Sequence, residues 1–129
     1  MDSQPKAIPR ILIVEDEPMV AIDIEQALTE FGFNIAGVAF SLETALELVA
    51  SAGFDAVILD ANLKGMSAEP VAAAISALGL PFIVTTGYGR DQRPEGLRGA
   101  PYLRKPYRPA ELLRALEQIL TPYALQTSE

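Results

Sequence analysis

The chain has 129 residues, a net charge of −7 and 50% hydrophobic residues. That composition suits one folded domain with a hydrophobic core and argues against general disorder. The chain contains neither cysteine nor histidine, which excludes disulfides, thiolate and imidazole metal sites, and nucleophilic triads with a histidine base. No apolar run reaches the ~20 residues of a membrane span, and residues 1–6 lack the apolar stretch of a secretory signal. We therefore predict a cytoplasmic protein that uses carboxylate, hydroxyl and lysine chemistry.

Apolar runs alternate with helical patterns along the first half of the chain. Residues 11–14, 35–40 and 56–59 are short apolar runs of the kind found in buried strands. Between them, apolar residues recur at helical spacing over 17–31 and 42–52. Ser41 is the predicted N-cap of the second helix. The first half therefore predicts three strands joined by two helices.

The second half continues this alternation, with one exception. Ser67 is a predicted N-cap for a helix over 68–78, and a fourth strand begins at 82–84. Residues 102–103 predict a short fifth strand, and 108–120 a final amphipathic helix. The stretch between the last two strands holds six residues that disfavour a helix: Gly87, Gly89, Pro94, Gly96, Gly99 and Pro101. We predict a loop there with at most one short helical turn.

This order of elements predicts an α/β fold, because alternating strands and helices form right-handed crossovers around a parallel sheet. We predict a single domain over 1–129, with a core over about 10–121 between short flexible tails. The expected architecture is a flavodoxin-like, five-stranded parallel sheet of order 2-1-3-4-5, with helices on both faces and a fourth helix that is short or absent. Ligands of such sheets bind at the carboxyl ends of the strands. The residues at those ends are Glu15 and Asp16, Asp60, Thr85 and Thr86, and Lys105.

Three of these residues are carboxylates that the fold would bring together. At ~5 Å and an effective dielectric constant of ~20, each pair of Glu15, Asp16 and Asp60 would repel by about 3 kcal/mol. Such a cluster favours a hard cation such as Mg²⁺, and the backbone carbonyl of Asn62 could supply another oxygen. Lys105 could counter the remaining charge, and a threonine hydroxyl could bind an incoming anion. This combination suits formation of an aspartyl phosphate.

The motifs around these residues are specific enough to indicate a family. From about residue 11 to 120, the chain resembles a response-regulator receiver domain of two-component signalling. The resemblance rests on four motifs: Ile-Leu-Ile-Val-Glu15-Asp16-Glu17-Pro18, Val-Ile-Leu-Asp60-Ala-Asn62-Leu, Thr86, and Lys105-Pro106.

The resemblance implies a role for each matching residue. Asp60 would be the phosphoacceptor, Asp16 a direct Mg²⁺ ligand, and Glu15 a support for the metal, through water. Lys105 would bind the phosphoryl group. The remaining implied features are a switch hydroxyl at Thr86, an aromatic switch at Tyr102 and a cis peptide bond before Pro106.

The fourth strand also resembles receivers that carry a Phe-Ala-Thr-Gly motif, which are common in α-proteobacteria. Here the corresponding stretch is Pro81-Phe82-Ile83-Val84-Thr85-Thr86-Gly87-Tyr88. Val84 and Thr85 replace Phe and Ala, so counting from Pro81 identifies Thr86 as the switch hydroxyl and leaves Thr85 as the alternative.

The predicted function is a phosphorylation-dependent signalling switch. The phosphoryl donor would be a histidine kinase or a histidine phosphotransferase, and the output an unknown downstream protein or a phosphorelay, without an output domain in this chain. We expect a monomer or weak dimer. Ordering of residues 87–99 when phosphate binds is a possible readout.

Two other functions remain open. One is a degenerate receiver that binds a protein constitutively, and the other is a Mg²⁺-dependent phosphatase with an aspartate nucleophile. Asn62 disfavours the phosphatase, which uses a second acid at that position. Charge is uneven: residues 11–63 hold ten acids and no Lys or Arg, whereas 90–114 hold seven basic residues and three acids. This pattern fits either ordinary solvated surface or an acidic metal-binding side opposite a basic face. The basic residues lack the dense cluster of a nucleic-acid site.

Overall fold

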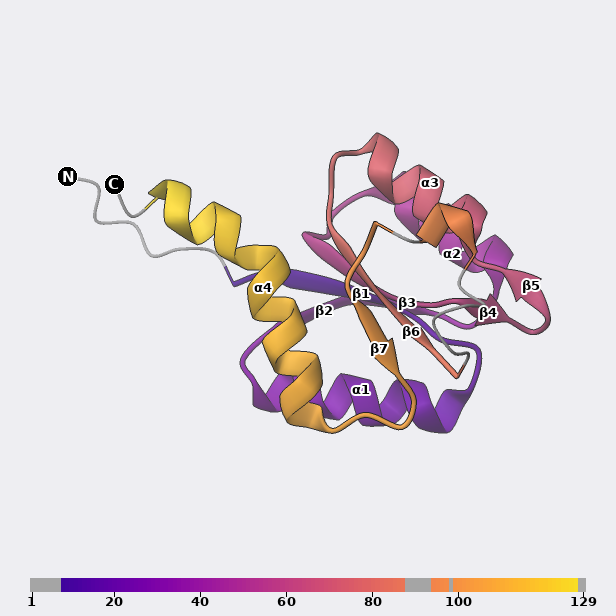
Figure 1. Cartoon of the computed structure of the whole chain (residues 1–129), viewed down its shortest axis with the longest axis horizontal. Helices are drawn as coiled ribbons and strands as arrows, with labels where there is room; N and C mark the ends of the chain where they lie inside the picture. Colours follow the sequence, from indigo (N-terminus) through magenta and orange to yellow (C-terminus); the bar gives the residue numbers. More distant parts are fainter. Residues whose placement is uncertain (1–7, 88–93, 98, 128–129) are drawn as a thin grey trace.

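The computed structural model describes residues 8–87, 94–97 and 99–127, and its centre is a five-stranded parallel sheet. The strand order is β2-β1-β3-β6-β7 (Figure 1), which confirms the predicted flavodoxin-like topology. The strands are β1 (Arg10–Val14), β2 (Asn34–Ala39), β3 (Ala56–Asp60), β6 (Phe82–Thr86) and β7 (Tyr102–Arg104). β1 and β3 are therefore central strands, and β2 and β7 form the two edges.

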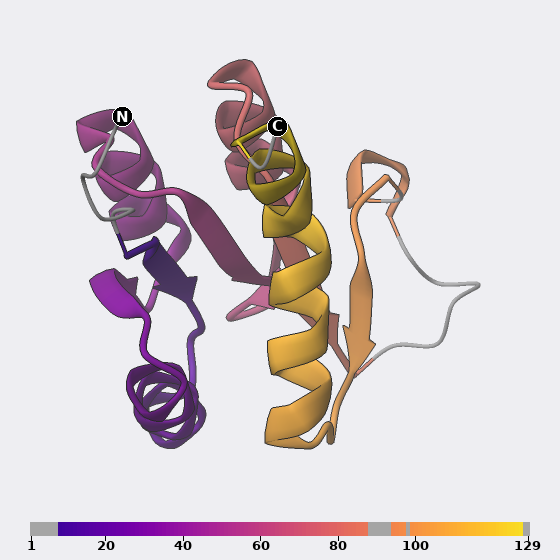
Figure 2. The same cartoon turned by 90° about the vertical axis from the view of Figure 1, so that its left-hand side faces the viewer.

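Helices cover both faces of this sheet. They are α1 (Pro18–Glu30), α2 (Leu42–Ser51), α3 (Glu69–Ala77) and α4 (Pro109–Thr127). α1 and α4 lie on one face, and α2 and α3 on the other (Figures 1 and 2). Each pair buries its own core, so β1 contributes Ile11 and Ile13 to the α1–α4 side and Leu12 and Val14 to the α2–α3 side. Because successive residues of a strand point to opposite faces, a strand covered on both sides must be apolar throughout.

The connection after β3, which lies between the predicted third strand and the helix that follows it, is not a simple loop. It contains a small antiparallel hairpin, β4 (Asn62–Leu63) and β5 (Met66–Ser67). The two residues of its turn, Lys64 and Gly65, have φ angles of 55° and 85°. Two consecutive positive φ values are characteristic of the type I′ turn that closes tight hairpins.

Two helix termini also test the sequence predictions. Ser41 caps α2 as predicted, because its hydroxyl accepts the backbone N–H of Thr44 at 3.2 Å. The predicted cap of the next helix is displaced: Ser67 pairs with Asn62 in the hairpin, and α3 begins only at Glu69, after Ala68. The Ser67 hydroxyl still accepts the backbone N–H of Glu69 at 3.1 Å.

The last two connections complete the fold. A 3₁₀ turn, η2 (Glu95–Leu97), lies between β6 and β7, in the stretch where at most one short helical turn was predicted. The rest of that stretch, at 88–93 and 98, lies outside the described residues. α4 extends to Thr127 and is longer than the predicted helix over 108–120. Within the described part of the chain, no helix is long and apolar enough to cross a membrane.

Candidate functional site

The predicted acidic residues come together at the carboxyl edge of the sheet. Glu15 follows β1 and Asp60 ends β3, two neighbouring strands in register. One carboxylate oxygen from each of Glu15, Asp16 and Asp60 lies within 4.8 Å of the other two. Glu15 and Asp60 are only 1% and 5% exposed, so two negative charges of this cluster are largely removed from solvent.

Lys105 brings a positive charge into the cluster. Its ammonium group lies 3.0 Å from Oε1 of Glu15 and 3.1 Å from Oδ2 of Asp60, and forms an ion pair with each. The backbone N–H of Lys105 donates to the Thr86 carbonyl at 2.7 Å, which ties the end of β7 to β6. The peptide bond between Lys105 and Pro106 is cis, as the resemblance implied. The sequence thus correctly predicted that this lysine meets the acids.

Burial and charge change the ionisation of two of these groups. Burial raises the pKa of Glu15 from 4.5 to about 7, although the hydrogen bond from Lys105 acts in the opposite direction, and the charge of Asp60 raises it further. Burial lowers the pKa of Lys105, but its contacts with Glu15 and Asp60 outweigh this effect and leave that pKa raised. The three carboxylates therefore carry more negative charge than the Lys105 ammonium group neutralises.

The donor atoms suit a small, hard cation. The three carboxylates offer oxygen ligands only, which Mg²⁺ prefers over nitrogen or sulfur. At the ~2.1 Å bond lengths of Mg²⁺, opposite ligands lie about 4 Å apart, and the oxygens of this cluster span a comparable distance. A divalent cation would also relieve the buried charge that raises the pKa of Glu15. The residues present therefore fit Mg²⁺.

The β4–β5 hairpin holds two of the carboxylates through its backbone, which the sequence did not reveal. The N–H of Lys64 donates to Oδ2 of Asp16 at 2.9 Å, and the N–H of Asn62 donates to Oδ1 of Asp60 at 3.1 Å. Oδ1 of Asn62 accepts the N–H of Gly65 at 2.8 Å. The dipeptide Lys64-Gly65 was the only available signal, because glycine at such a position favours a tight turn.

The two threonines at the end of β6 occupy different faces of the sheet. Asp60 pairs with Thr85, and Tyr102 pairs with Val84. Strand alternation therefore places Thr85 on the face that carries Asp60, and Thr86 on the face of Tyr102. Both threonines are 1% exposed, and the Thr85 hydroxyl has no hydrogen-bond partner among the described residues.

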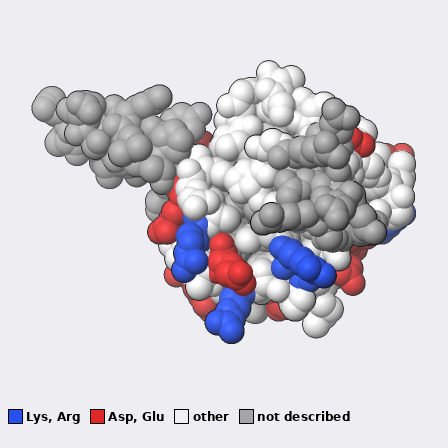
Figure 3. Space-filling model, viewed as in Figure 1, with Lys and Arg blue, Asp and Glu red and all other residues white. Residues whose placement is uncertain are grey.

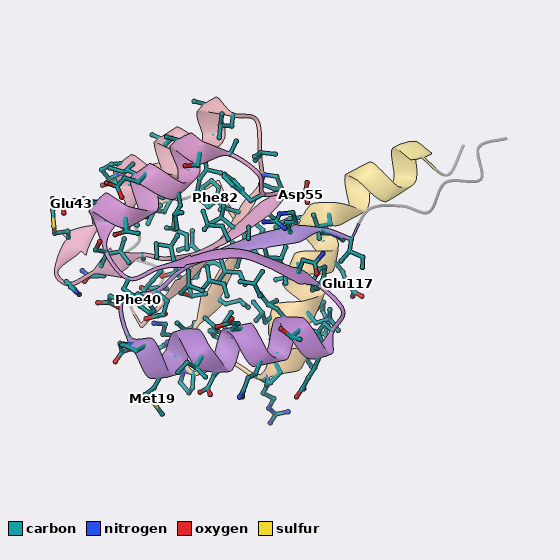
Figure 4. The ribbon with its side chains drawn as sticks, turned by 180° about the vertical axis from the view of Figure 1, so that it is seen from behind. Met19, Phe40, Glu43, Asp55, Phe82 and Glu117 are labelled. Atoms are coloured by element: carbon teal, nitrogen blue, oxygen red, sulfur yellow. The ribbon has the colours of Figure 1, made fainter. Side chains whose placement is uncertain are left out.

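Two large apolar side chains near the site, Met19 and Phe40, are exposed. In Figure 4, Met19 at the start of α1 and Phe40 at the end of β2 lie at the carboxyl edge, and Asp55 lies at the opposite edge. Figure 3 shows several Lys or Arg groups on the face of β7 and the start of α4, with an acidic group between them. This view fits a mixed, solvated surface better than a uniformly basic face.

A groove adjoins the site between α1 and α4. It has a volume of about 720 Å³, and Lys105 lines one end. Its walls are formed by apolar side chains and by acidic or polar groups of α1, among them Val20, Ile24, Leu112, Asp23, Gln26 and Glu30. Tyr107 also lines the groove, and burial raises its pKa to about 12.

Comparison with known proteins gives a consistent result. Residues 11–117 match the family described as the response regulator receiver domain. The transcriptional regulatory protein PdtaR of Mycobacterium tuberculosis is 32% identical over 116 residues, which cover 86% of this chain and 57% of that protein. The phyllosphere-induced regulator PhyR of Methylorubrum extorquens is 31% identical, over 85% of this chain and 43% of that protein. The chain thus spans about half the length of these relatives.

Solved structures extend the similarity to three dimensions. The solution structure of SdrG from Sphingomonas melonis Fr1 is 37% identical, with a TM-score of 0.79, over 90% of this chain and 99% of that one. The response regulator PhyR from Brucella abortus is 27% identical, with a TM-score of 0.79, over 95% of this chain and 52% of that one.

Proposed function

Because this chain belongs to the response regulator receiver domain family of two-component signalling, we propose that it is a switch controlled by phosphorylation of Asp60. The observation that carries this proposal is the buried Asp60 carboxylate, held by Lys105 within the acidic cluster. Members of the family typically use Mg²⁺, and the three carboxylates fit that ion. The finer placement among receivers with a Phe-Ala-Thr-Gly motif stays a prediction.

Each residue of the site would have a separate role in the transfer of a phosphoryl group to Asp60. An Asp60 oxygen attacks the phosphorus of a phosphohistidine, the new O–P bond forms, and the P–N bond breaks as the imidazole leaves. The Lys105 ammonium group neutralises charge on the transferring phosphoryl oxygens. Glu15 and Asp16, with the Asn62 carbonyl, would hold Mg²⁺, which when bound supplies a positive charge for those same oxygens. In dephosphorylation, water attacks the phosphorus and the bond between the Asp60 oxygen and phosphorus breaks. Inorganic phosphate leaves and the Asp60 carboxylate is restored.

Thr86 and Tyr102 would report the phosphorylated state. We assign the switch hydroxyl to Thr86 because Thr86 lies on the face of the sheet that carries Tyr102. A hydroxyl drawn toward the phosphoryl group would leave space near Tyr102, which is half-buried. This assignment of the two residues rests on strand register and on the family resemblance.

The decisive test is intact mass after incubation with acetyl phosphate and Mg²⁺. Wild type should gain one phosphoryl group, and Asp60→Asn should gain none, because an amide oxygen is a poor nucleophile. The matched control is Asp55→Asn at the other end of β3, which should be phosphorylated like wild type. An unmodified wild type would favour a degenerate receiver, and rapid turnover of many equivalents of phosphate would favour a phosphatase.

The groove between α1 and α4 supports a histidine kinase or phosphotransferase as the donor. We propose that a donor helix with apolar side chains flanked by basic ones occupies it, since the α1 wall carries Asp23 and Glu30 but no Lys or Arg. Gln26→Arg places a bulky cation on this wall, where Gln26 is exposed. Phosphorylation by a phosphohistidine donor protein should slow about tenfold, and phosphorylation by acetyl phosphate should not change. The tenfold effect corresponds to about 1.4 kcal/mol of lost binding of the donor protein. Equal slowing with both donors would refute this docking site, because acetyl phosphate needs no docking surface.

A further inference from the structure

A carboxylate at the start of α3 joins two segments that are far apart in sequence. Oε2 of Glu69 accepts the backbone N–H of Gly96 in η2 at 2.9 Å. Oε1 of the same carboxylate accepts the hydroxyl of Ser67, the last residue of β5, at 3.1 Å. Glu69 therefore connects the hairpin that follows Asp60 to the turn between β6 and β7.

The contact between Glu69 and η2 is close and well supported. A Cβ atom at Gly96 would lie 2.9 Å from Oε2 and 3.0 Å from Cγ of Glu69, so a larger residue would displace the carboxylate. Leu97, the next residue, is fully buried in the α2–α3 core. η2 packs against α3 (Figure 1). Among the described residues, the buried Leu97 side chain and the hydrogen bond from the Gly96 N–H thus both attach this turn to the side of the molecule that carries α3.

The same hairpin reaches the acidic cluster at its other end. Its turn donates the Lys64 N–H to Asp16, and its first residue, Asn62, donates to Asp60. The hairpin strands are two residues long and paired with each other. The paired strands therefore join the turn directly to Ser67.

We propose that Glu69 is a latch that couples occupancy of the acidic cluster to the position of η2. A cation bound at the cluster attracts the Asp16 carboxylate, which accepts the Lys64 N–H, and the paired hairpin carries this change to Ser67. The Glu69 carboxylate then transmits it to the N–H of Gly96. This route does not involve Thr86, the proposed switch hydroxyl at the end of β6. The proposal rests on the proposed function, because that function supplies the ligand that binds the acidic cluster.

The test follows backbone amide signals by NMR while Mg²⁺ and beryllofluoride, a mimic of the phosphoryl group, are added. In wild type, the amide signals of Lys64 and Gly96 should both shift. In Glu69→Ala, the Lys64 signal should still shift, and the shift of Gly96 should be lost. Glu69→Gln should restore it, because the amide oxygen can still accept the Gly96 N–H.

Two further variants test whether the response of η2 depends specifically on the contact between Glu69 and Gly96. Gly96→Ala should uncouple the Leu97 amide from the ligand in the same way, because the new Cβ displaces the Glu69 carboxylate. Glu43→Ala is the matched control, since Glu43 occupies the first turn of the neighbouring helix α2, and it should leave every response intact. A Gly96 shift of wild-type size in Glu69→Ala would overturn the latch.

The outcomes also separate this proposal from the function it depends on. If the wild-type Lys64 signal shifts but the Gly96 signal does not, the latch is wrong and the phosphoacceptor site stands. If neither signal shifts and no beryllofluoride adduct forms at Asp60, both proposals fail. Coupling of this kind typically changes affinity by fivefold or more, so Glu69→Ala should also change the Mg²⁺ dissociation constant by about that factor.

Discussion

The candidate site has two unequal halves. Glu15 and Asp16 directly follow β1, and Asp60 ends β3. Both strands have neighbours on both sides and apolar cores on both faces. Lys105 comes from the end of β7, an edge strand of three residues, and its side chain is 23% exposed. The acidic half is therefore fixed by the core of the domain, whereas the lysine half has room to follow a phosphoryl group.

Among the predicted changes, removing the Lys105 side chain should have the largest effect on stability. Lys105→Ala leaves Glu15 and Asp60 buried without their cation, and losing one partner of a buried pair is destabilising. Because Lys105 is partly exposed, we expect a loss of about 1–3 kcal/mol in the free energy of unfolding, measured in urea without Mg²⁺, together with slower phosphorylation. Arg104→Ala, an exposed cation on the same strand, should have little effect on either. A Lys105→Ala variant as stable and as active as wild type would show that the acidic half needs no lysine.

The acidic half can be tested through its pH dependence. Glu15 has a pKa of about 7 in the folded protein and an ordinary value of 4.5. The folded state therefore binds the proton more tightly than the unfolded state, and this stabilisation, complete below pH 4.5, is lost as the pH rises through 7. Since the chain has no histidine, no unperturbed side chain titrates between pH 5 and 8.

Glu15→Gln isolates that contribution. Without Mg²⁺, wild type should lose on the order of 2–3 kcal/mol of unfolding free energy between pH 5 and pH 8. The variant should lose much less, because the neutral amide resembles the protonated acid. Glu17→Gln, an exposed acid two residues away, should behave like wild type. Equal slopes for wild type and Glu15→Gln in urea titrations would contradict the raised pKa.

The smallest predicted effect on stability comes from Thr85→Val, and it tests whether the hydroxyls of Thr85 and Thr86 have different roles. Thr85→Val removes a buried hydroxyl that has no hydrogen-bond partner among the described residues, and deleting such a group is neutral or stabilising. We expect the melting temperature to stay the same or rise by a few degrees, corresponding to less than about 1 kcal/mol. Thr86→Val should instead reduce the response to phosphorylation. Loss of that response in Thr85→Val would reverse the assignment of the switch.

The sequence predicts the framework of this molecule well and its local connections poorly. Apolar runs and helical periodicity predicted the strand order, and the rule for carboxyl ends brought Asp60 and Lys105 together, because both patterns follow from burial in a parallel sheet. The backbone contact from Lys64 to Asp16 could not be predicted, because every residue except proline has a backbone N–H and only the geometry of the turn directs this one to Asp16. The contact of Glu69 with Gly96 could not be predicted either. The two residues are 27 positions apart, and no repeating pattern of residue types indicates that they meet.

The two edges of the sheet have one further consequence. β7 offers only three residues of open backbone. The register of β2 against β1 shifts, because Ile35 pairs with Ile11 and Gly37 with Leu12, so that Ala36 interrupts the ladder. Short strands and irregular registers are features by which natural proteins prevent strands of separate molecules from joining edge to edge. Both edges of the sheet therefore carry features that disfavour the addition of a strand from another molecule.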